Sequence, residues 1–156
     1  MNTPAQGALA GLAATVPMTL AMELLWRRLP RDQRYPLPPR EITDQIRPTD
    51  LGEVPSRQLA LAAHFAFGAA AGAIFPMITS SRRPTAGAAY GVGVWAASYL
   101  GWIPAAGLLK PAHSHPLRRN LLMIGVHLIW GATVALALRQ MERAEMAPPR
   151  RSGPHS

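Results

Sequence analysis

The chain of 156 residues lacks cysteine, which excludes disulfide frameworks, thiolate zinc sites and thiol nucleophiles. Charge is also scarce, because only 15% of the residues are charged, against about 25% in an ordinary soluble domain. Lysine contributes a single residue, Lys110, so arginine supplies nearly all of the positive charge behind the net +8. The few charges separate long apolar stretches. This segregation argues against a soluble globular domain.

Catalytic signatures are missing as well. The sequence has no Walker loop, no GxSxG, no HExxH and no GxGxxG that follows a strand and opens a helix. Gly91-Val-Gly93 lies inside an apolar stretch and cannot cradle a phosphate there. We therefore predict that the protein is not an enzyme, and a membrane metalloenzyme is the catalytic alternative that stays open.

Four long apolar blocks dominate what is present, over residues 5–26, 59–79, 85–109 and 120–138. With a rise of about 1.5 Å per residue, each block matches the hydrocarbon core of a bilayer, about 30 Å thick. Backbone amides in lipid need partners within their own segment, so each block should be a helix. The sequence predicts an all-α integral membrane protein, with a four-helix transmembrane bundle over residues 1–140 and a disordered basic tail over 141–156.

A long loop rich in proline and arginine joins the first two blocks over residues 27–58. Its prolines forbid one long helix. A short helix from Arg40 to Ile46 is compatible with the pattern, and it would place Ile42 and Ile46 on one face against the membrane surface.

The distribution of basic residues predicts an orientation. Four spans place both termini on one side, and the loops 27–58 and 110–119 on the other side hold ten of the sixteen basic residues. The positive-inside rule then places these loops in the cytoplasm and both termini outside. Because the arginines flank apolar spans, where they anchor at the interface, we expect the lipid bilayer as partner and no nucleic acid.

Small residues four apart predict close packing between helices. Such pairs let a neighbouring backbone approach, and they favour a tight bundle, a homo-oligomer or a membrane-protein partner. Trp95, Tyr99 and Trp102 form an aromatic stripe at helical spacing, which indicates a lipid-facing or bundle-filling surface. The pairs are Gly7 and Gly11, Gly68 and Gly72, and Gly87 and Gly91.

An internal repeat relates the second and fourth blocks. His64-Phe-Ala-Phe-Gly-Ala and His127-Leu-Ile-Trp-Gly-Ala both fit the pattern H-x-x-aromatic-G-A. The first and third blocks share their glycine pair. The chain is therefore predicted to contain two repeated helical hairpins.

The repeat places ionisable groups at one depth. His64 and His127 should lie one to two turns inside the face that carries the long loop, and Glu23 should lie near the same face. His113 and His115, in a proline-bounded loop at that end, are possible accessory ligands or simply solvated. Ionisable groups inside a bilayer usually face the bundle interior and each other.

Three roles for these residues stay open. His64 and His127 can be structural groups that lock helices together, and this needs no ligand. With Glu23 they can bind zinc or iron, and a facing histidine pair suits haem iron. They can also relay protons or line a solute pathway. Glu23 has a further alternative as a helix-end ion pair with Arg27.

The sequence also resembles a known group. Gly7-x3-Gly11 running into Ala14-Thr-Val-Pro17-Met-Thr, then Leu29-Pro30 and Pro38-Pro-Arg-Glu-Ile42, is similar to the opening of the YagU-like bacterial inner-membrane proteins. The stretches that begin at His64 and His127 resemble the wider group. The resemblance covers roughly residues 5–140. It implies a small multi-pass protein of the bacterial inner (cytoplasmic) membrane, with unassigned biochemistry and no catalytic residues to transfer.

Overall fold

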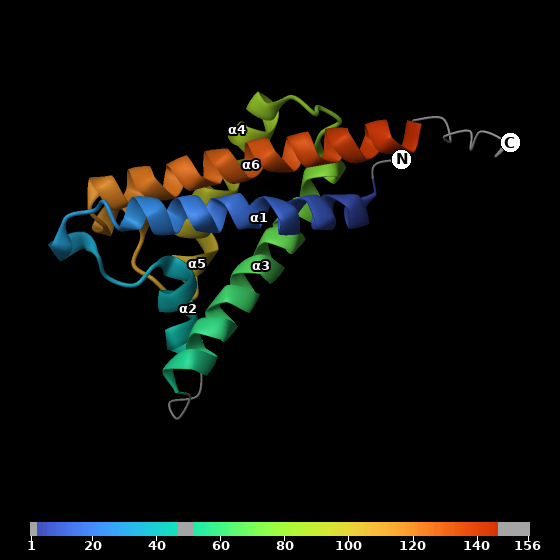
Figure 1. The fold of residues 1–156 in the computed structure, drawn as a ribbon. Helices are drawn as coiled ribbons and strands as arrows, with labels where there is room; N and C mark the ends of the chain where they lie inside the picture. The colour runs from blue at the N-terminus through green and yellow to red at the C-terminus, as the bar shows by residue number, and fades with distance from the viewer. Residues whose placement is uncertain (1–2, 47–51, 147–156) are drawn as a thin grey trace, which may run out of the picture.

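The computed structural model describes residues 3–46 and 52–146, and these residues form helices and connecting turns without any strand (Figure 1). The predicted all-α class is confirmed. The short predicted helix is present as α2. The elements in chain order are α1 (Pro4–Trp26), the 3-10 turn η1 (Arg31–Gln33), α2 (Pro38–Ile46), α3 (Glu53–Ile78), α4 (Pro84–Ala96), the π-helix η2 (Ala97–Trp102), α5 (Ile103–Ala105), the 3-10 turn η3 (Ala112–Ser114) and α6 (Leu117–Met146).

Three of the helices, α1, α3 and α6, are long and apolar enough to cross a membrane, which indicates a membrane protein. The predicted blocks 5–26 and 120–138 lie within α1 and α6, and block 59–79 lies within α3 except for Thr79, which follows its last residue. Their outer faces carry exposed large apolar side chains. On α1 these follow one stripe, formed by Leu9, Leu12, Val16, Leu20 and Leu24.

The third block departs from the single helix predicted over residues 85–109. α4 ends at Ala96 and continues as the π-helix η2, inside which Gly101 leaves helical geometry at φ −114° and ψ −108°. Two residues explain the break. Pro104 has no N–H to donate to the carbonyl one turn earlier, and glycine adopts non-helical backbone angles at little cost. The prediction of one continuous helix is therefore wrong in its second half.

α1 and α6 lie side by side and antiparallel, so that the start of α1 lies near the end of α6 (Figure 1). Thr3 and Gln6 form a capping box at the start of α1, and the Gln6 side chain also donates to Glu145 near the end of α6. Arg82 holds the same end of α6 through Glu142, with its Nε 2.8 Å from Oε1. These contacts extend α6 to Met146, so 141–146 of the predicted disordered tail is helical. The remainder of that tail lies outside the described residues.

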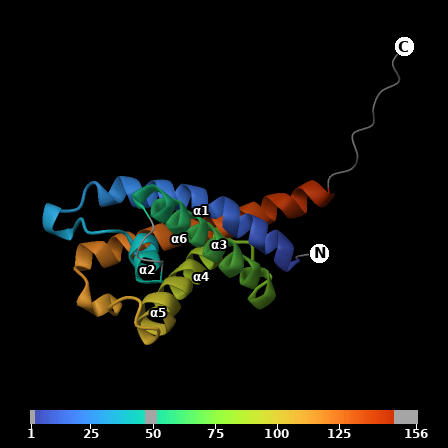
Figure 2. The same ribbon diagram turned by 90° about the horizontal axis from the view of Figure 1, so that it is seen from below.

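Backbone-to-backbone contact joins α1 to α3, which cross at a steep angle (Figures 1 and 2). Gly7 and Gly11 of α1 face Gly72 and Gly68 of α3. A Cβ built on Gly11 would collide with the carbonyl oxygen of Gly68, and one on Gly72 would lie 2.6 Å from the Gly11 Cα. No side chain fits between these two helices at the crossing.

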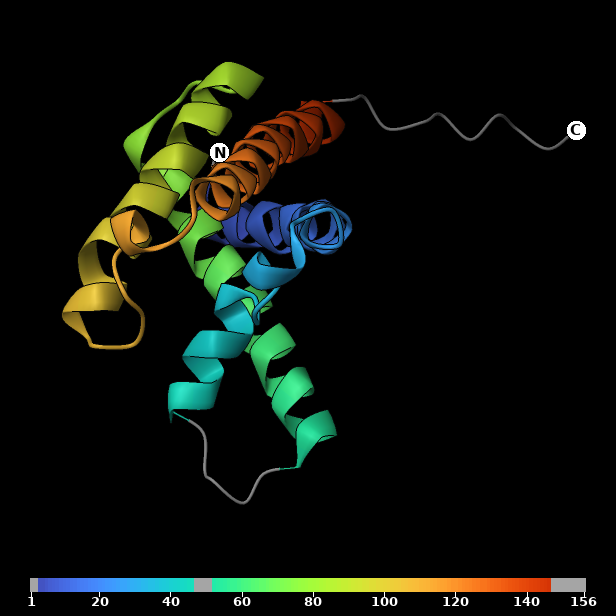
Figure 3. The ribbon, with the colours of Figure 1, turned by 90° about the vertical axis from the view of Figure 1, so that its left-hand side faces the viewer.

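The contact between α4 and α6 has the same character. Gly87 and Gly91 of α4 face the α6 backbone at Gly131 and His127. A Cβ on Gly91 would overlap the His127 carbonyl oxygen and would lie 2.9 Å from the carbonyl carbon. Figure 3 looks nearly along α1 and α6, with α4 on one side of this pair and α2 and α3 below it.

Candidate functional site

An apolar cavity of about 240 Å³ lies inside the helix assembly, with walls from α1, α2, α3, α4, η2, α5 and α6. Both repeat histidines line it, His64 from α3 and His127 from α6. The two histidines, which the sequence predicts to lie at one depth and to face the bundle interior, therefore line one cavity. Most of the remaining wall is formed by methionine, isoleucine, valine and aromatic side chains.

The His127 ring is held by its own helix. Its Nδ1 lies 2.7 Å from the carbonyl oxygen of Met123, one turn earlier, and the side chain is only 6% exposed. A carbonyl oxygen can only accept, so Nδ1 carries the proton. In the neutral ring Nε2 is then the hydrogen-bond acceptor. His127 therefore brings an acceptor nitrogen to the cavity wall without bonding across helices.

Two other wall residues carry polar atoms that are buried without a hydrogen-bond partner among the described residues. They are Nε2 of His64 and the hydroxyl of Tyr99. Tyr99 itself is 6% exposed. A buried polar group left unpaired costs about 1–3 kcal/mol, so such groups are rare and call for an explanation.

Four other polar side chains of the wall donate to partners within the structure. Thr15 donates to the carbonyl oxygen of Gly11 at 2.8 Å, and Thr43 donates to that of Pro39 at 2.9 Å. Trp130 Nε1 also donates to Gly11, at 3.3 Å, and Trp102 Nε1 donates to Ser98 Oγ at 3.3 Å. The Ser98 hydroxyl accepts this last bond. The buried wall atoms without any hydrogen-bond partner among the described residues are His64 Nε2 and the Tyr99 hydroxyl, and Nε2 of His127 adds an acceptor.

The π-helix η2 brings Ser98, Tyr99 and Trp102 to the cavity. π-Helical turns are rare and often occur at functional sites. At membrane depth, irregular backbone is tolerated where it is buried in protein or lines a cavity. Sequence reasoning had placed Tyr99 in an aromatic stripe and missed its unpaired hydroxyl. The available signal was a phenol inside an apolar block, since a buried tyrosine normally finds a partner.

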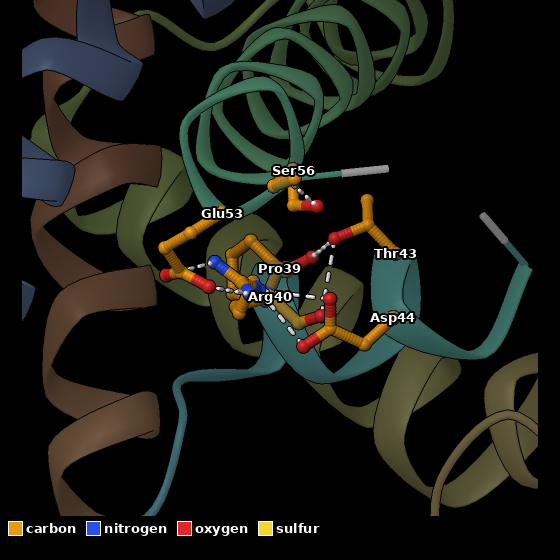
Figure 4. A network of polar contacts seen from close by, with 7 residues as sticks. Pro39, Arg40, Thr43, Asp44, Glu53 and Ser56 are labelled. Carbon is orange, nitrogen blue, oxygen red and sulfur yellow. Dashed lines mark hydrogen bonds and ion pairs between the residues drawn. The ribbon is translucent and has the colours of Figure 1, made fainter. Parts of the chain in front are cut away.

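The helix α2 forms one wall of the cavity through Pro38, Ile42 and Ile46. Arg40 connects α2 to the start of α3 by two parallel hydrogen bonds to Glu53 (Figure 4). Its Nη1 lies 2.9 Å from Oε1, and its Nη2 lies 2.8 Å from Oε2. Its Nε also bonds both carboxylate oxygens of Asp44 on α2 itself. Isoleucines predicted to meet the membrane surface thus meet the cavity.

A second cluster fastens the loop before α2 to the start of α6. Arg119 is 2% exposed and donates to the carbonyl oxygens of Tyr35 at 3.1 Å and Pro36 at 2.5 Å. It also pairs with Glu41 at 2.8 Å. The guanidinium lies 3.6 Å from the centroid of the Tyr35 ring, within cation–π range.

The loop histidines have different surroundings from those predicted. His115 Nδ1 lies 2.7 Å from the Tyr35 hydroxyl, and its Nε2 lies 3.1 Å from the carbonyl oxygen of Lys110. Since that carbonyl only accepts, Nε2 donates and Nδ1 of the neutral ring accepts from Tyr35. His115 is therefore part of the cluster around Tyr35 and Arg119 that holds the loop before α2, and it does not line the cavity. His113 is exposed.

Glu23 forms an ion pair with Arg27 at the end of α1, one of the two alternatives that the sequence left open. Its Oε1 lies 3.1 Å from Arg27 Nη2, and both side chains are largely exposed. Glu23 lines a separate polar groove of about 730 Å³, which His64 also borders. Among residues 3–46 and 52–146, no group of three or more His, Cys, Asp or Glu is placed to hold a metal ion. The predicted metal set of Glu23, His64 and His127 is therefore not assembled.

The carboxyl group of Glu41 provides a pH-dependent test of the cluster around Arg119. Burial raises the pKa of its carboxyl above the usual value, and the Arg119 guanidinium opposes this shift. A raised folded-state pKa contributes stability below the unfolded-state pKa that is lost as pH rises through the folded-state pKa. As pH rises from the ordinary pKa of a glutamate carboxyl, about 4.3, through the raised folded-state pKa, the unfolding free energy of the wild type should therefore fall relative to Glu41→Gln. Denaturation of both proteins at several pH values measures this difference. If the unfolding free energies of the wild type and Glu41→Gln changed in parallel with pH, Glu41 would not have a raised pKa in the folded state.

Comparison with protein-family models, with curated proteins and with solved structures finds no match to this chain.

Proposed function

We propose that the protein is a non-enzymatic multi-pass membrane protein that holds a small, mostly apolar molecule in the cavity around His64, Tyr99 and His127. The observation that carries this proposal is the pair of buried, unpaired polar atoms, His64 Nε2 and the Tyr99 hydroxyl, on residues that line an otherwise apolar cavity. Binding sites for small molecules combine apolar walls with a few polar groups in this way. A bound molecule with its own polar atoms would satisfy them.

The cavity size limits the ligand. An engineered apolar cavity of about 150 Å³ accepts benzene. The cavity here, at about 240 Å³, therefore suits a substituted ring or a short chain. The entry route proposed is the bilayer, because apolar molecules concentrate there and the Trp102 side chain is both part of the wall and 46% exposed.

The membrane arrangement is part of the proposal. We infer four spans in two hairpins, one that pairs α1 with α3 and one that pairs the segment α4–η2–α5 with α6, supported by the matching glycine contacts in both pairs. The resemblance to YagU-like proteins supports a bacterial inner membrane. The distribution of arginines supports both termini outside. A homo-oligomer or a membrane-protein partner remains part of this proposal.

A second candidate is passage of a proton or small solute between the polar groove and the cavity. His64 favours it, because this residue borders both spaces. The structural alternative, histidines that lock helices, fits His127 less well. The His127 ring bonds the Met123 carbonyl oxygen of its own helix, and the helices meet instead through glycine backbone.

Quenching of tryptophan fluorescence by bromobenzene tests the proposed binding. Trp102 and Trp130 line the cavity, whereas the other two tryptophans do not. We expect a saturable quenching component on top of the linear component caused by partitioning into detergent. Val94→Phe, which adds bulk to the cavity wall, should remove the saturable component.

The matched control is Val16→Phe, because Val16 lies on the outer face of α1 and is 48% exposed. This variant should show the same saturable quenching by bromobenzene as the wild type. Ile42→Phe fills the same cavity from α2 and guards against a folding defect in Val94→Phe. Equal, purely linear quenching in all four proteins would rule out the binding function.

A further inference from the structure

The chemistry of the cavity wall narrows the class of ligand, and this step rests on the proposed binding function. From the tautomer of His127 and its neighbours, we infer that the site takes a small hydroxylated aromatic ring, a phenol or hydroquinone, whose hydroxyl donates to Nε2 of His127. The argument has three parts, which concern the acceptor, the donors and the ring.

The acceptor follows from the bond to Met123. With the Nδ1 proton committed to the Met123 carbonyl oxygen at 2.7 Å, the neutral ring has only Nε2 left, and that atom carries a lone pair. A ligand that offers only acceptors, such as an ether or a ketone, would face this lone pair without a proton. A hydroxyl group supplies the proton.

The donors on the wall complement the other half of a hydroxyl. The Tyr99 O–H has no partner among the described residues, and neither has His64 Nε2. The oxygen of a ligand hydroxyl can accept from the Tyr99 hydroxyl, or from His64 when the proton of that ring is on Nε2, while the hydrogen of the ligand is donated to His127. One hydroxyl group therefore satisfies both kinds of unpaired atom. An apolar ligand would satisfy neither, and each unsatisfied group carries a desolvation cost.

The ring follows from the size and composition of the wall. Phe67, Tyr99, Trp102 and Trp130 all line the cavity, and the rings of Phe67 and Trp102 lie 6.1 Å apart between centroids. Aromatic groups favour offset or edge-on contacts with other rings at such separations. The volume of about 240 Å³ accommodates one substituted ring.

The test compares three bromoarenes as quenchers, namely 4-bromophenol, 4-bromoanisole and bromobenzene. The anisole keeps the ring and the oxygen of the phenol but has no proton to donate. For the wild type we expect the saturable quenching by 4-bromophenol to have a dissociation constant about tenfold lower than that of 4-bromoanisole, the effect of about one buried hydrogen bond. Dissociation constants are referred to the free aqueous probe, so that detergent partitioning cancels.

Two variants connect this preference to His127. His127→Phe keeps a ring but removes the acceptor, and it should bring the dissociation constants of 4-bromophenol and 4-bromoanisole together, with bromobenzene measured in the same variant as the reference. His127→Gln retains an acceptor oxygen and should keep a preference for the phenol. Neither variant alters the backbone carbonyl that meets Gly91.

Cyclohexanol checks the requirement for a ring. It has a hydroxyl but no aromatic face, and we expect it to displace 4-bromophenol far less effectively than phenol does. The inference is overturned if all three bromoarenes bind alike in the wild type, or if His127→Phe leaves the phenol preference unchanged. In both cases saturable bromobenzene binding would still support the proposed function. Loss of saturable binding by every probe would instead remove both proposals.

Discussion

Arg119→Met is expected to lower the free energy of unfolding by about 2–3 kcal/mol, because it would leave the half-buried Glu41 carboxylate without its cation. The change also removes donors to the carbonyl oxygens of Tyr35 and Pro36. Methionine fills much of the same volume, so the loss reports the polar contacts and not a void. Denaturation in mixed micelles with SDS, followed by far-UV circular dichroism, measures the effect.

The control for this prediction is the preceding residue. Arg118 is exposed on the same turn of α6, and Arg118→Met should change the unfolding free energy by less than about 0.5 kcal/mol. A large effect at both positions would indicate that charge at the membrane surface, and not the buried cluster, stabilises the fold. The double variant Arg119→Met/Glu41→Leu should recover part of the stability, because no uncompensated carboxylate remains.

Gly91→Ala is expected to destabilise the bundle by about 1–3 kcal/mol or more. The added Cβ would overlap the carbonyl oxygen of His127 and approach the Gly131 nitrogen to 3.2 Å. Both neighbours are backbone atoms, so no rotamer change can relieve the overlap and α4 must move away from α6. Because His127 lines the cavity, the same variant should also weaken saturable quenching by bromobenzene.

Gly93→Ala provides the matched comparison, two residues further along the same helix. A Cβ at Gly93 meets no described atom within 4 Å, so only the helix propensity of alanine should matter. This propensity favours alanine by about 0.5–1 kcal/mol, which predicts a small gain in stability. The outcome that contradicts the packing argument is a similar response at the two glycines, measured by the same SDS denaturation.

Much of the fold could be predicted from the residues alone. Long apolar blocks separated by charge predict membrane-length helices, and α1, α3 and α6 fulfil that description. The short helix α2 was also predictable, since it lies between prolines and carries isoleucines four residues apart. In both cases the signal is local, a run of residues whose own chemistry determines the conformation.

The third block, residues 85–109, shows where this kind of reasoning reaches its limit. Its composition is as apolar as that of the other blocks, so hydropathy predicts one helix. Gly101 and Pro104 weaken the helix, but whether it breaks depends on the neighbours that pack against η2. A cavity that accepts irregular backbone is a property of several elements together.

The candidate site divides in the same manner. The repeated H-x-x-aromatic-G-A pattern correctly singled out His64 and His127 as neighbours of one cavity. For Glu23 the structure has the helix-end ion pair with Arg27, one of the two alternatives left open by the sequence, and His115 bonds Tyr35, which neither of its alternatives included. Depth in a membrane can be counted along a helix, but the direction of a side chain relative to other helices cannot.

Taken by itself, the sequence determined the helical class, the three membrane-length helices and the small faces on which helices can approach. Each of these follows from local composition and periodicity. Only the tertiary structure decided which helix meets which face, and that Arg119 rather than Glu23 is the buried charge with a structural partner. It also brought Tyr99, His64 and His127 around one space. The physical reason is that cavities and unpaired polar atoms arise where several helices meet, and no single segment of the chain encodes them.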